Sequence, residues 1–311
     1  MIRRLEERDI PEARRIVQLA FGTFVGAPDP GRFFSDIDYV ETRWRADNSA
    51  AFVAEIDGKV VGSNFATGWG SVGFFGPLTV HPDLWNKGVA QQLMQPVMEC
   101  FDRWNVTHAG LYTFAESPKH IALYQRYGFY PRFLTAILSK PVDPGRAGEM
   151  THTKFSELPS SDRDRVIESC YRLTDSIYPG LNVEREVRAI HAQNLGDTVM
   201  LWNDVELVAF AVCHCGPGTE AGNNKCYIKF GAARPGSGIG LHFEALIRAC
   251  ESFSASRGLT QLVAGVNLAR HEAYTSILSQ GFRVDRTGVT MHRPSEPGYS
   301  RAGVFVIDDW R

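Results

Sequence analysis

An internal repeat is the feature of this 311-residue sequence that most restricts its fold. A glycine turn before a helix pattern, at Gly88, returns 150 residues later at Gly238, and a Gly-Phe pair at 128–129 returns 153 residues later. Landmarks at nearly one spacing indicate a duplicated domain rather than the short period of a solenoid. A stretch rich in proline and glycine, 141–148, divides the sequence near its middle. We therefore predict a domain over residues 1–140, a linker over 141–149 and a second domain over 150–311.

Apolar periodicity predicts the elements of the first copy. Alternation favours strands at 2–7, 51–56, 59–67, 72–80, 107–114 and 129–138, and a 3.6-residue period favours helices at 11–21, 35–45, 88–104 and 118–126. Polar pairs indicate hairpin turns, at 57–58 in the first copy and at 203–204 in the second, where strands are expected at 198–202 and 205–212. This order predicts an α+β fold. Each copy is expected to have a mixed, mainly antiparallel sheet with helices on both faces.

Charge and cysteine usage limit the class of protein. The net charge of −2 and the absence of a basic run argue against a nucleic-acid partner, and no apolar stretch approaches a membrane span. Six cysteines without a C-x-x-C motif favour reduced thiols in a cytoplasmic protein. Cys213 and Cys215 alternate with His214 in an apolar run, which favours a core pair over a metal site. We expect no metal.

The segment from Leu78 to Ala90 has the properties of an anion-binding turn. A strand pattern ends in it, a helix pattern begins at Gly88, and Lys87 adds a cation. Unpaired N–H groups at a helix start suit a pyrophosphate, which small side chains allow to approach the backbone. The spacings of a P-loop and of a Rossmann turn are both missing.

The same segment resembles motif A of the GNAT (general-control-related N-acetyltransferase) superfamily, [QR]-x-x-G-x-[GA] after a V-x-P strand end. The resemblance implies that the turn wraps the pyrophosphate of acetyl-CoA and that the preceding strand bonds its pantetheine arm. Trp85 occupies the family's Gln or Arg position, which commonly acts through its backbone N–H. The cofactor-binding residues implied are Leu78, Thr79, Val80, Trp85, Asn86, Lys87, Gly88, Val89 and Ala90.

A second stretch, 117–129, resembles motif B of the same family, N-x-x-A-x-x-L-Y-E-x-x-G-F. Ser117 replaces the usual Asn and suits a helix N-cap before Pro118. Tyr124 falls on the family's tyrosine, which implies contact with the thioester sulfur and a role as general acid. Both residues join the predicted acetyl-CoA site. The two motifs, the order of the strands and the length together extend the resemblance over residues 1–140.

The second copy departs from the family pattern. Gly238 and Gly240 fit motif A, but Pro235 takes the Gln/Arg position and has no N–H. The tyrosine position falls on Ile277, with Tyr274 one turn away. We expect this domain to be degenerate and to shape the acceptor cleft instead.

The resemblance implies an N-acetyltransferase that moves an acetyl group from acetyl-CoA to a primary amine of a small molecule or peptide, by direct attack. The base is open between His81, His120, Glu116 and a water chain, since 70–80 contains no acid. Alternatives are a non-catalytic acyl-CoA sensor or interaction protein, and a tandem GNAT enzyme of the mycothiol synthase type. We expect a monomer or homodimer that works without nucleic acid or membrane.

Overall fold

The computed structural model describes residues 1–204 and 206–311. The elements of the first half follow the predicted order. They are β1 (Ile2–Arg4), α1 (Ile10–Phe24), α2 (Val40–Ala46), β2 (Ala51–Ile56), β3 (Lys59–Trp69), β4 (Val72–Phe75), β5 (Thr79–Val80), α3 (Val89–Arg103), β6 (His108–Thr113), α4 (Pro118–Gln125) and β7 (Tyr130–Pro141).

The second half repeats this order with one strand, β11, in place of β4 and β5, and adds one short strand at its end. Its elements are β8 (Thr153–Lys154), α5 (Ser160–Ile177), α6 (Glu184–Ala192), β9 (Gly196–Asn203), β10 (Glu206–Cys215), β11 (Lys225–Ala233), α7 (Ile239–Ser256), β12 (Gln261–Asn267), α8 (His271–Ser279), β13 (Arg283–Arg293) and β14 (Val306–Ile307).

Local signals explain most boundaries. Gly88 and Gly238 both adopt φ 81° as the residue before α3 and α7, a left-handed conformation that favours glycine. Asp57 and Gly58 form the predicted hairpin turn, with φ 50° and 74°. In the second hairpin Asn203 pairs with Glu206, so the turn begins after Asn203. Val205, expected to open the next strand, lies outside the described residues.

One predicted strand is wrong in its continuity. The stretch 72–80 is divided into β4 and β5 by the cis peptide between Gly76 and Pro77. The first strand is also shorter than predicted, because a 3-10 turn over Glu7–Asp9 follows it. By contrast, α3 continues through Pro96 from Val89 to Arg103.

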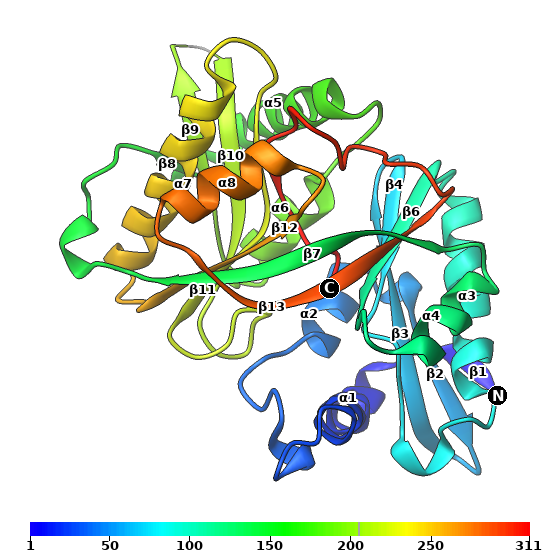
Figure 1. Cartoon of the computed structure of the whole chain (residues 1–311). Helices are drawn as coiled ribbons and strands as arrows, with labels where there is room; N and C mark the ends of the chain where they lie inside the picture. The colour runs from blue at the N-terminus through cyan, green and yellow to red at the C-terminus, as the bar shows by residue number, and fades with distance from the viewer. Residues whose placement is uncertain (205) are drawn as a thin grey trace.

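The described strands form one sheet in which the two halves exchange their long late strands. The order is β1-β2-β3-β4-β6-β13-β7-β12-β11-β10-β9-β8, with β5 beside β3 and β14 beside β11. Strand β13 of the second half therefore lies between β6 and β7 of the first, and β7 lies against β12. Figure 1 shows β7 and β13 side by side across the middle of the molecule. The parallel pairs are β4 with β6 and β11 with β12.

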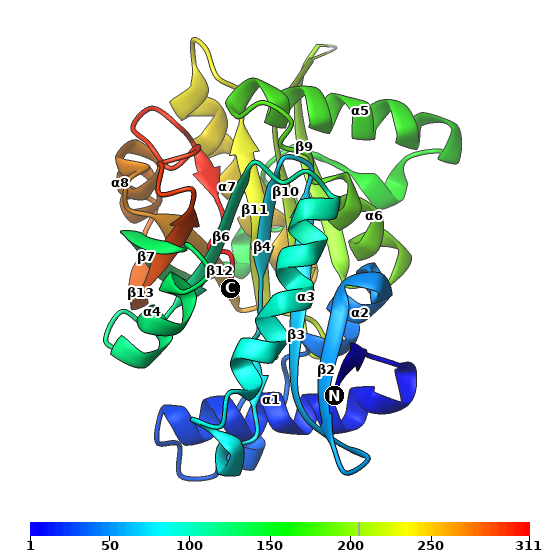
Figure 2. The same cartoon turned by 90° about the vertical axis from the view of Figure 1, so that its right-hand side faces the viewer.

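Helices cover both faces of the sheet in each half. In the first half, α3 and Tyr124 of α4 pack on one face, and α1 and α2 pack on the other. Figure 2 shows α3 in front of β3 and β4. In the second half, α7 and α8 cover one face and α5 and α6 the other. This is the predicted α+β arrangement.

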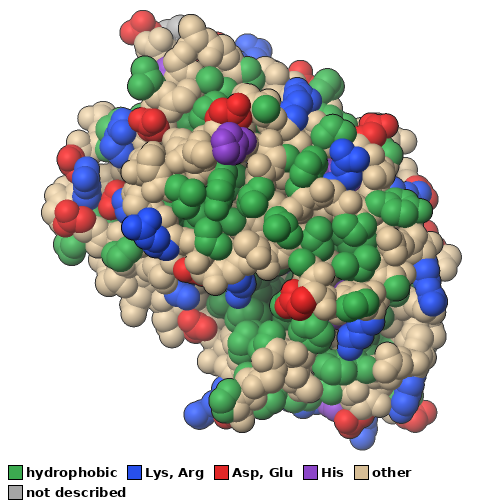
Figure 3. All heavy atoms as spheres, viewed as in Figure 1, with side chains coloured by type: hydrophobic (Ala, Val, Ile, Leu, Met, Phe, Trp, Pro, Cys, Tyr) green, Lys and Arg blue, Asp and Glu red, His purple; other side chains and the backbone are tan. Residues whose placement is uncertain are grey.

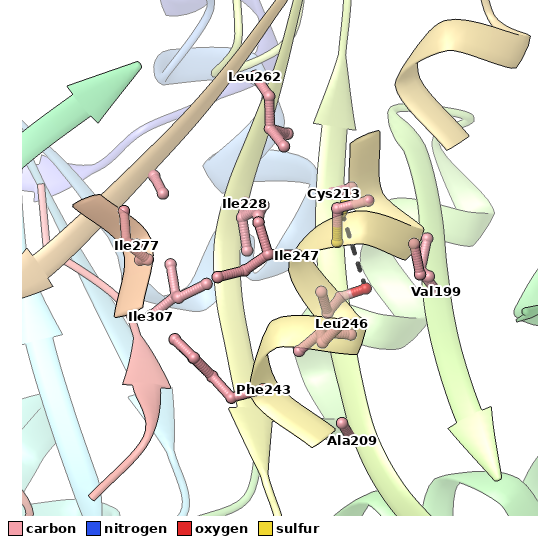
Figure 4. Packing of buried hydrophobic residues seen from close by; sticks show 14 of the residues in the cluster. Val199, Ala209, Cys213, Ile228, Phe243, Leu246, Ile247, Leu262, Ile277 and Ile307 are labelled. Atoms are coloured by element: carbon pink, nitrogen blue, oxygen red, sulfur yellow. Dashed lines mark hydrogen bonds between the residues drawn. The ribbon is translucent and has the colours of Figure 1, made fainter. Parts of the chain in front are cut away.

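Three of the large hydrophobic cores contain side chains of both halves. Ala136 and Leu138 of β7 belong to the core under α7, part of which Figure 4 shows around Phe243 and Ile247. Val289 and Met291 of β13 belong to the core under α3. A third core joins Trp69 and other first-half residues to α5 and α6. The halves are therefore packed as one body.

Within residues 1–204 and 206–311, none of the helices combines the length and apolar character that crossing a membrane requires.

Candidate active site

A cleft of about 580 Å³ opens in the first half between α1, the segment from β4 to α3, and α4. Its lining comes from four stretches, 20–39, 75–91, 111–126 and 286–311. Figure 3 shows the molecule hollowed below its centre, where hydrophobic side chains line the depression. The last of the four stretches belongs to the second half.

The cleft exists because two parallel strands separate. Strand β4 pairs with β6 over Val72–Phe74 only, and the chain then turns at the cis Gly76–Pro77 peptide. Strand β5 pairs with Gly62 and Ser63 of β3 on one side. No described strand pairs with its other edge, so the backbone of Leu78–Val80 faces the cleft. An extended ligand can pair with such an edge through main-chain hydrogen bonds.

Arg43 holds the turn at Gly76, next to this wall of the cleft, in place. Its guanidinium donates to the carbonyl of Gly76 at 2.5 Å and makes two bonds to the carboxylate of Glu220, at 2.9 and 3.0 Å. Both side chains are buried. A bidentate, buried pair has a fixed geometry, so the second half holds the turn that opens the cleft.

The glycine turn forms one end of the cleft. Asn86 and Gly88 both have positive φ, at 63° and 81°, and α3 begins directly after them. Along α3, the first N–H that donates to a carbonyl of the turn is that of Gln92, which bonds to the carbonyl of Gly88 at 3.3 Å. The N–H groups before it have no partner within the helix and carry partial positive charge. This geometry suits an anion such as a pyrophosphate.

Trp85 supports the turn by its side chain. The indole N–H donates to the carbonyl of Val80 at 2.8 Å, and the ammonium of Lys119 lies 4.5 Å from the ring centroid. Its backbone N–H donates to the carbonyl of Pro82 at 3.1 Å. The expectation that this position contacts a ligand through its N–H is therefore not met in this conformation. The indole forms part of the cleft wall instead.

Tyr124 lies on α4 and lines the cleft. It is buried, with its ring 5.6 Å from that of Phe75 in an edge-on contact. Burial raises the pKa of its phenol well above the usual range, and a hydrogen bond with Thr113 acts weakly in the other direction. The hydroxyl therefore stays protonated at neutral pH.

Two of the three side chains considered as base line the cleft. His120 and Glu116 are in its wall, whereas His81 is not. His120 packs between Phe24 and Phe114, at centroid distances of 4.9 and 6.1 Å. Burial, and to a lesser extent Lys119, lowers the pKa of His120 to about 4. It is thus neutral at pH 7, in the form that accepts a proton.

The cleft brings together most of the predicted site residues. Those that line it are Leu78, Thr79, Val80, Trp85, Asn86, Gly88, Val89, Ala90 and Tyr124. Lys87 is exposed outside the lining, and Ser117 is buried before α4, where its side chain makes no capping bond. Their predicted contacts with a ligand remain predictions.

Sequence reasoning missed the aromatic and second-half walls. The aromatic wall consists of Phe21, Phe24, Phe33, Phe34, Tyr39 and Phe114. The density of phenylalanine between positions 21 and 34 could have indicated it. The second half contributes Arg286, Thr287, Trp310 and Arg311. This agrees with the expectation that the second domain shapes the cleft, although no local pattern marked these residues.

The corresponding region of the second half lacks a hydroxyl like that of Tyr124. Ile277 holds the tyrosine position and is fully buried in the core under α7, with Tyr274 packed partly buried beside it. Among the described residues, no cluster of three or more His, Cys, Asp or Glu could hold a metal ion.

Residues 13–129 match the family model described as Acetyltransferase (GNAT) family. The first half of the chain is therefore similar to acetyltransferases of the GNAT family. No curated protein sequence matches the chain.

Solved structures extend the similarity of fold to the whole chain. A protein from Pyrococcus horikoshii, named as a candidate acetyltransferase, matches with 13% identity and a TM-score of 0.67, covering 100% of this chain and 94% of that one. A GCN5-related N-acetyltransferase from Sphaerobacter thermophilus matches with 16% identity and a TM-score of 0.56, covering 96% of each chain. A GCN5-related glucosamine N-acetyltransferase region of a fungal multi-domain GH3 β-N-acetylglucosaminidase matches with 13% identity and a TM-score of 0.61, covering 94% of this chain and 38% of that one. At these identities the likeness concerns the fold.

Proposed function

We propose that this protein is an acetyl-CoA-dependent N-acetyltransferase that acts on a primary amine of a small molecule or peptide, with one working site in the first half. The observation that carries the proposal is the cleft itself. It joins an open strand edge at Leu78–Val80, a glycine turn at Gly88 and a buried tyrosine hydroxyl at Tyr124. The repeats are proposed to be residues 1–140 and 150–311.

The geometry fits acetyl-CoA as co-substrate. The position that a Cβ would take at Gly88 has no neighbour closer than the Gln91 side chain at 4.0 Å, so the backbone there is open to an anion. The free edge of β5 offers peptide groups to an amide-bearing arm. The helix start and Tyr124 both line this cleft.

The mechanism follows from direct transfer, which requires orientation and proton movement but no covalent enzyme intermediate. Acetyl-CoA supplies an activated thioester. Tyr124 holds the proton that the leaving thiolate takes up. The amine of the acceptor loses its proton to His120, Glu116 or a water molecule between them. The aromatic wall excludes bulk water from the reacting groups.

The alternatives differ in what they require of each half. A non-catalytic sensor of acyl-CoA would bind in the same cleft and leave Tyr124 without effect. An enzyme of the mycothiol synthase type would be expected to work with its second domain, where Ile277 offers no acid. The six free cysteines support the proposed cytoplasmic location.

The test combines a titration with an assay. Calorimetric titration of the full chain with acetyl-CoA should return one site per chain. Thiol release should then rise above the rate of hydrolysis when a panel of primary amines is added. Binding with no amine-dependent release from any class of amine would favour the sensor. Two equivalent sites would contradict the single-site proposal.

A further inference from the structure

The segment that follows β13 forms an additional short strand in the second half. Strand β14 pairs antiparallel with β11, with Val306 opposite Ala232 and Ile307 opposite Gly231. The pairing continues one residue further, since the N–H of Ala233 donates to the carbonyl of Phe305 at 3.1 Å. A segment far along the chain has therefore become a strand neighbour of β11.

The edge that β14 covers is the counterpart of the open edge in the first half. Strand β11 begins parallel with β12 as β4 begins parallel with β6. Its later residues bond to β10 on one side, as β5 bonds to β3. In the first half the opposite edge faces the cleft. In the second half Val306 and Ile307 lie there, both fully buried.

Phe305 covers the second glycine turn. Its ring lies 5.2 Å from that of Phe243 on α7, and its outer carbon lies 3.8 Å from where a Cβ would stand at Gly240. Gly240 is the counterpart of Ala90, two residues after the glycine that starts the helix. The ring thus lies over the helix start at which an anion would approach.

A buried ionic group holds the segment in place. Arg270 donates to the carbonyl of Val306 at 2.9 Å and to the carboxylate of Asp308 at 2.6 Å. The hydroxyl of Tyr299 donates to the same carboxylate at 2.7 Å. Each of these three polar side chains is at most 2% exposed. Such a buried hydrogen-bond network fixes one position of the backbone.

The residues that follow reach the first half. Trp310 adopts a positive φ of 53° and lies against Gly110 of β6, where a Cβ would collide with its ring at 2.0 Å. The carbonyl of Arg311 accepts a hydrogen bond from Arg43, the residue that also holds Gly76. Trp310 and Arg311 both line the first cleft.

We propose that residues 304–311 form a strap with two functions. Residues 304–307 fill the second cleft in place of a co-substrate arm, and this attachment positions Trp310 and Arg311 as residues that determine acceptor specificity in the first. The second function rests on the proposed acetyltransferase activity. A degenerate cofactor site thus serves as the anchor for a wall of the working site.

The test uses Phe305→Ala in the full chain, with Leu241→Ala as control, because Leu241 lies in the first turn of α7 but is 70% exposed. Hydrogen exchange without ligand should quicken about tenfold or more in 229–240 and 304–311 of Phe305→Ala only, since loss of anchoring contacts favours local opening. Unchanged exchange in both segments would refute the strap. With acetyl-CoA, protection should appear in 78–90 and not in 231–240 of the wild type.

Steady-state kinetics test the second function. With the best amine of the panel, Phe305→Ala should raise the KM of the amine about tenfold and leave the KM of acetyl-CoA within about threefold. An unchanged amine KM would refute positioning by the strap. Protection of 231–240 by acetyl-CoA would show that the ligand displaces residues 304–307. It would overturn the proposal that these residues fill the second cleft. If acetyl-CoA protects neither segment, the proposed function is contradicted. The exchange measured without ligand still tests whether residues 304–307 are attached to the second half.

Discussion

At the scale of residues, the cleft shifts the pKa values of two titratable side chains in opposite directions. Tyr124 is buried, and its raised pKa keeps the proton on the phenol. His120 is neutral because the same effect of burial lowers its pKa to about 4. At neutral pH the phenol is therefore protonated and the imidazole neutral. Burial shifts the two pKa values in opposite directions because it disfavours the charged form of each group.

Replacing Tyr124 by phenylalanine tests the acid. Thiols have pKa values near 8.5, so a thiolate can leave without a proton at moderate cost, and we expect a loss in kcat of about a hundredfold. The KM of acetyl-CoA should change little, because the ring remains. Tyr127→Phe is the matched control, since its hydroxyl donates to the carbonyl of Gln91 and does not line the cleft. Unaltered kcat in Tyr124→Phe, with lower thermal stability, would leave this tyrosine as a core residue.

The two helix-start glycines provide a second comparison. Gly88 and Gly238 share φ 81°, so a valine at either position bears similar strain, of roughly 1–2 kcal/mol. Gly88→Val should also block the approach of an anion and weaken acetyl-CoA binding by at least about tenfold. Gly238→Val should leave the affinity unchanged. Calorimetry on both variants is the measurement, and equal affinities would show that the turn at Gly88 does not hold the co-substrate.

Sequence alone predicted the parts of the site that depend on local conformation. Glycine at 88 and at 238 marks a left-handed turn that any alternative residue would strain, so both turns could be located. The use of the Trp85 N–H within its own turn could not, because it depends on the course of the three preceding residues. Trp310 and Arg311 could not be placed either. Their position follows from pairing with β11, some 75 residues earlier in the sequence.

At the scale of elements, the exchange of β7 and β13 could not be predicted from the sequence. Alternation of side chains predicts that each is a strand and which residues face the core, but it does not specify the neighbouring strand. Both strands follow a Gly-Phe pair and suit either sheet. The observed seam joins β6 to β13 through a buried contact between His108 and His292, whose ring nitrogens lie 3.1 Å apart.

This seam should make stability depend on pH. Burial, with a contribution from Arg132, lowers the pKa of His108 to about 4, and burial and His108 lower that of His292 to about 3. Unfolded histidine titrates near 6.5, so between about pH 6.5 and 4 the unfolded chain binds protons that the folded chain does not. The stability contributed by the neutral pair is therefore complete above about pH 6.5 and decreases below it. At pH 5 the loss is about 2 kcal/mol for each histidine.

Urea unfolding at pH 7.5 and pH 5 measures this loss. His292→Asn should reduce the difference between the two pH values by about 2 kcal/mol, because the unfolded chain then has one fewer group to protonate. His271→Asn, at an exposed position of α8, should leave the difference as in the wild type. An equal difference in all three proteins would exclude His292 as a source of acid sensitivity.

At the scale of the whole molecule, a buried ionic network joins the two halves. Glu220 of the β10–β11 loop accepts from Arg43 of α2 and from Lys229 at 2.8 Å, and Lys229 also lies 3.3 Å from Glu186. Burial alone would raise the pKa of Glu220, but the two cations outweigh it and hold that pKa well below the usual range. The carboxylate is therefore charged at neutral pH, and the network requires both halves to be in place.

The last prediction is that the two halves unfold together. Because the halves exchange strands, neither half contains all the strands of its own part of the sheet. The shared cores and the Arg43–Glu220 pair add further contacts between the halves. Opening one half would expose apolar surface of both, which is the condition for a cooperative transition. Hydrogen exchange in increasing urea should give the same midpoint for peptides of β2–β3 and of β9–β10.

Glu220→Gln sharpens that test. Breaking a buried ion pair by removing one partner costs about 3–5 kcal/mol, because the remaining charge loses its compensation. Glu220 belongs to the second half, yet the substitution should lower both midpoints by the same amount if the molecule is one unit. Glu206→Gln is the control, since its pair with Arg234 is exposed on the glutamate side and exposed pairs contribute at most about 1 kcal/mol. A midpoint that falls only for β9–β10 would show two independently folding domains, and the strand exchange would then not couple them.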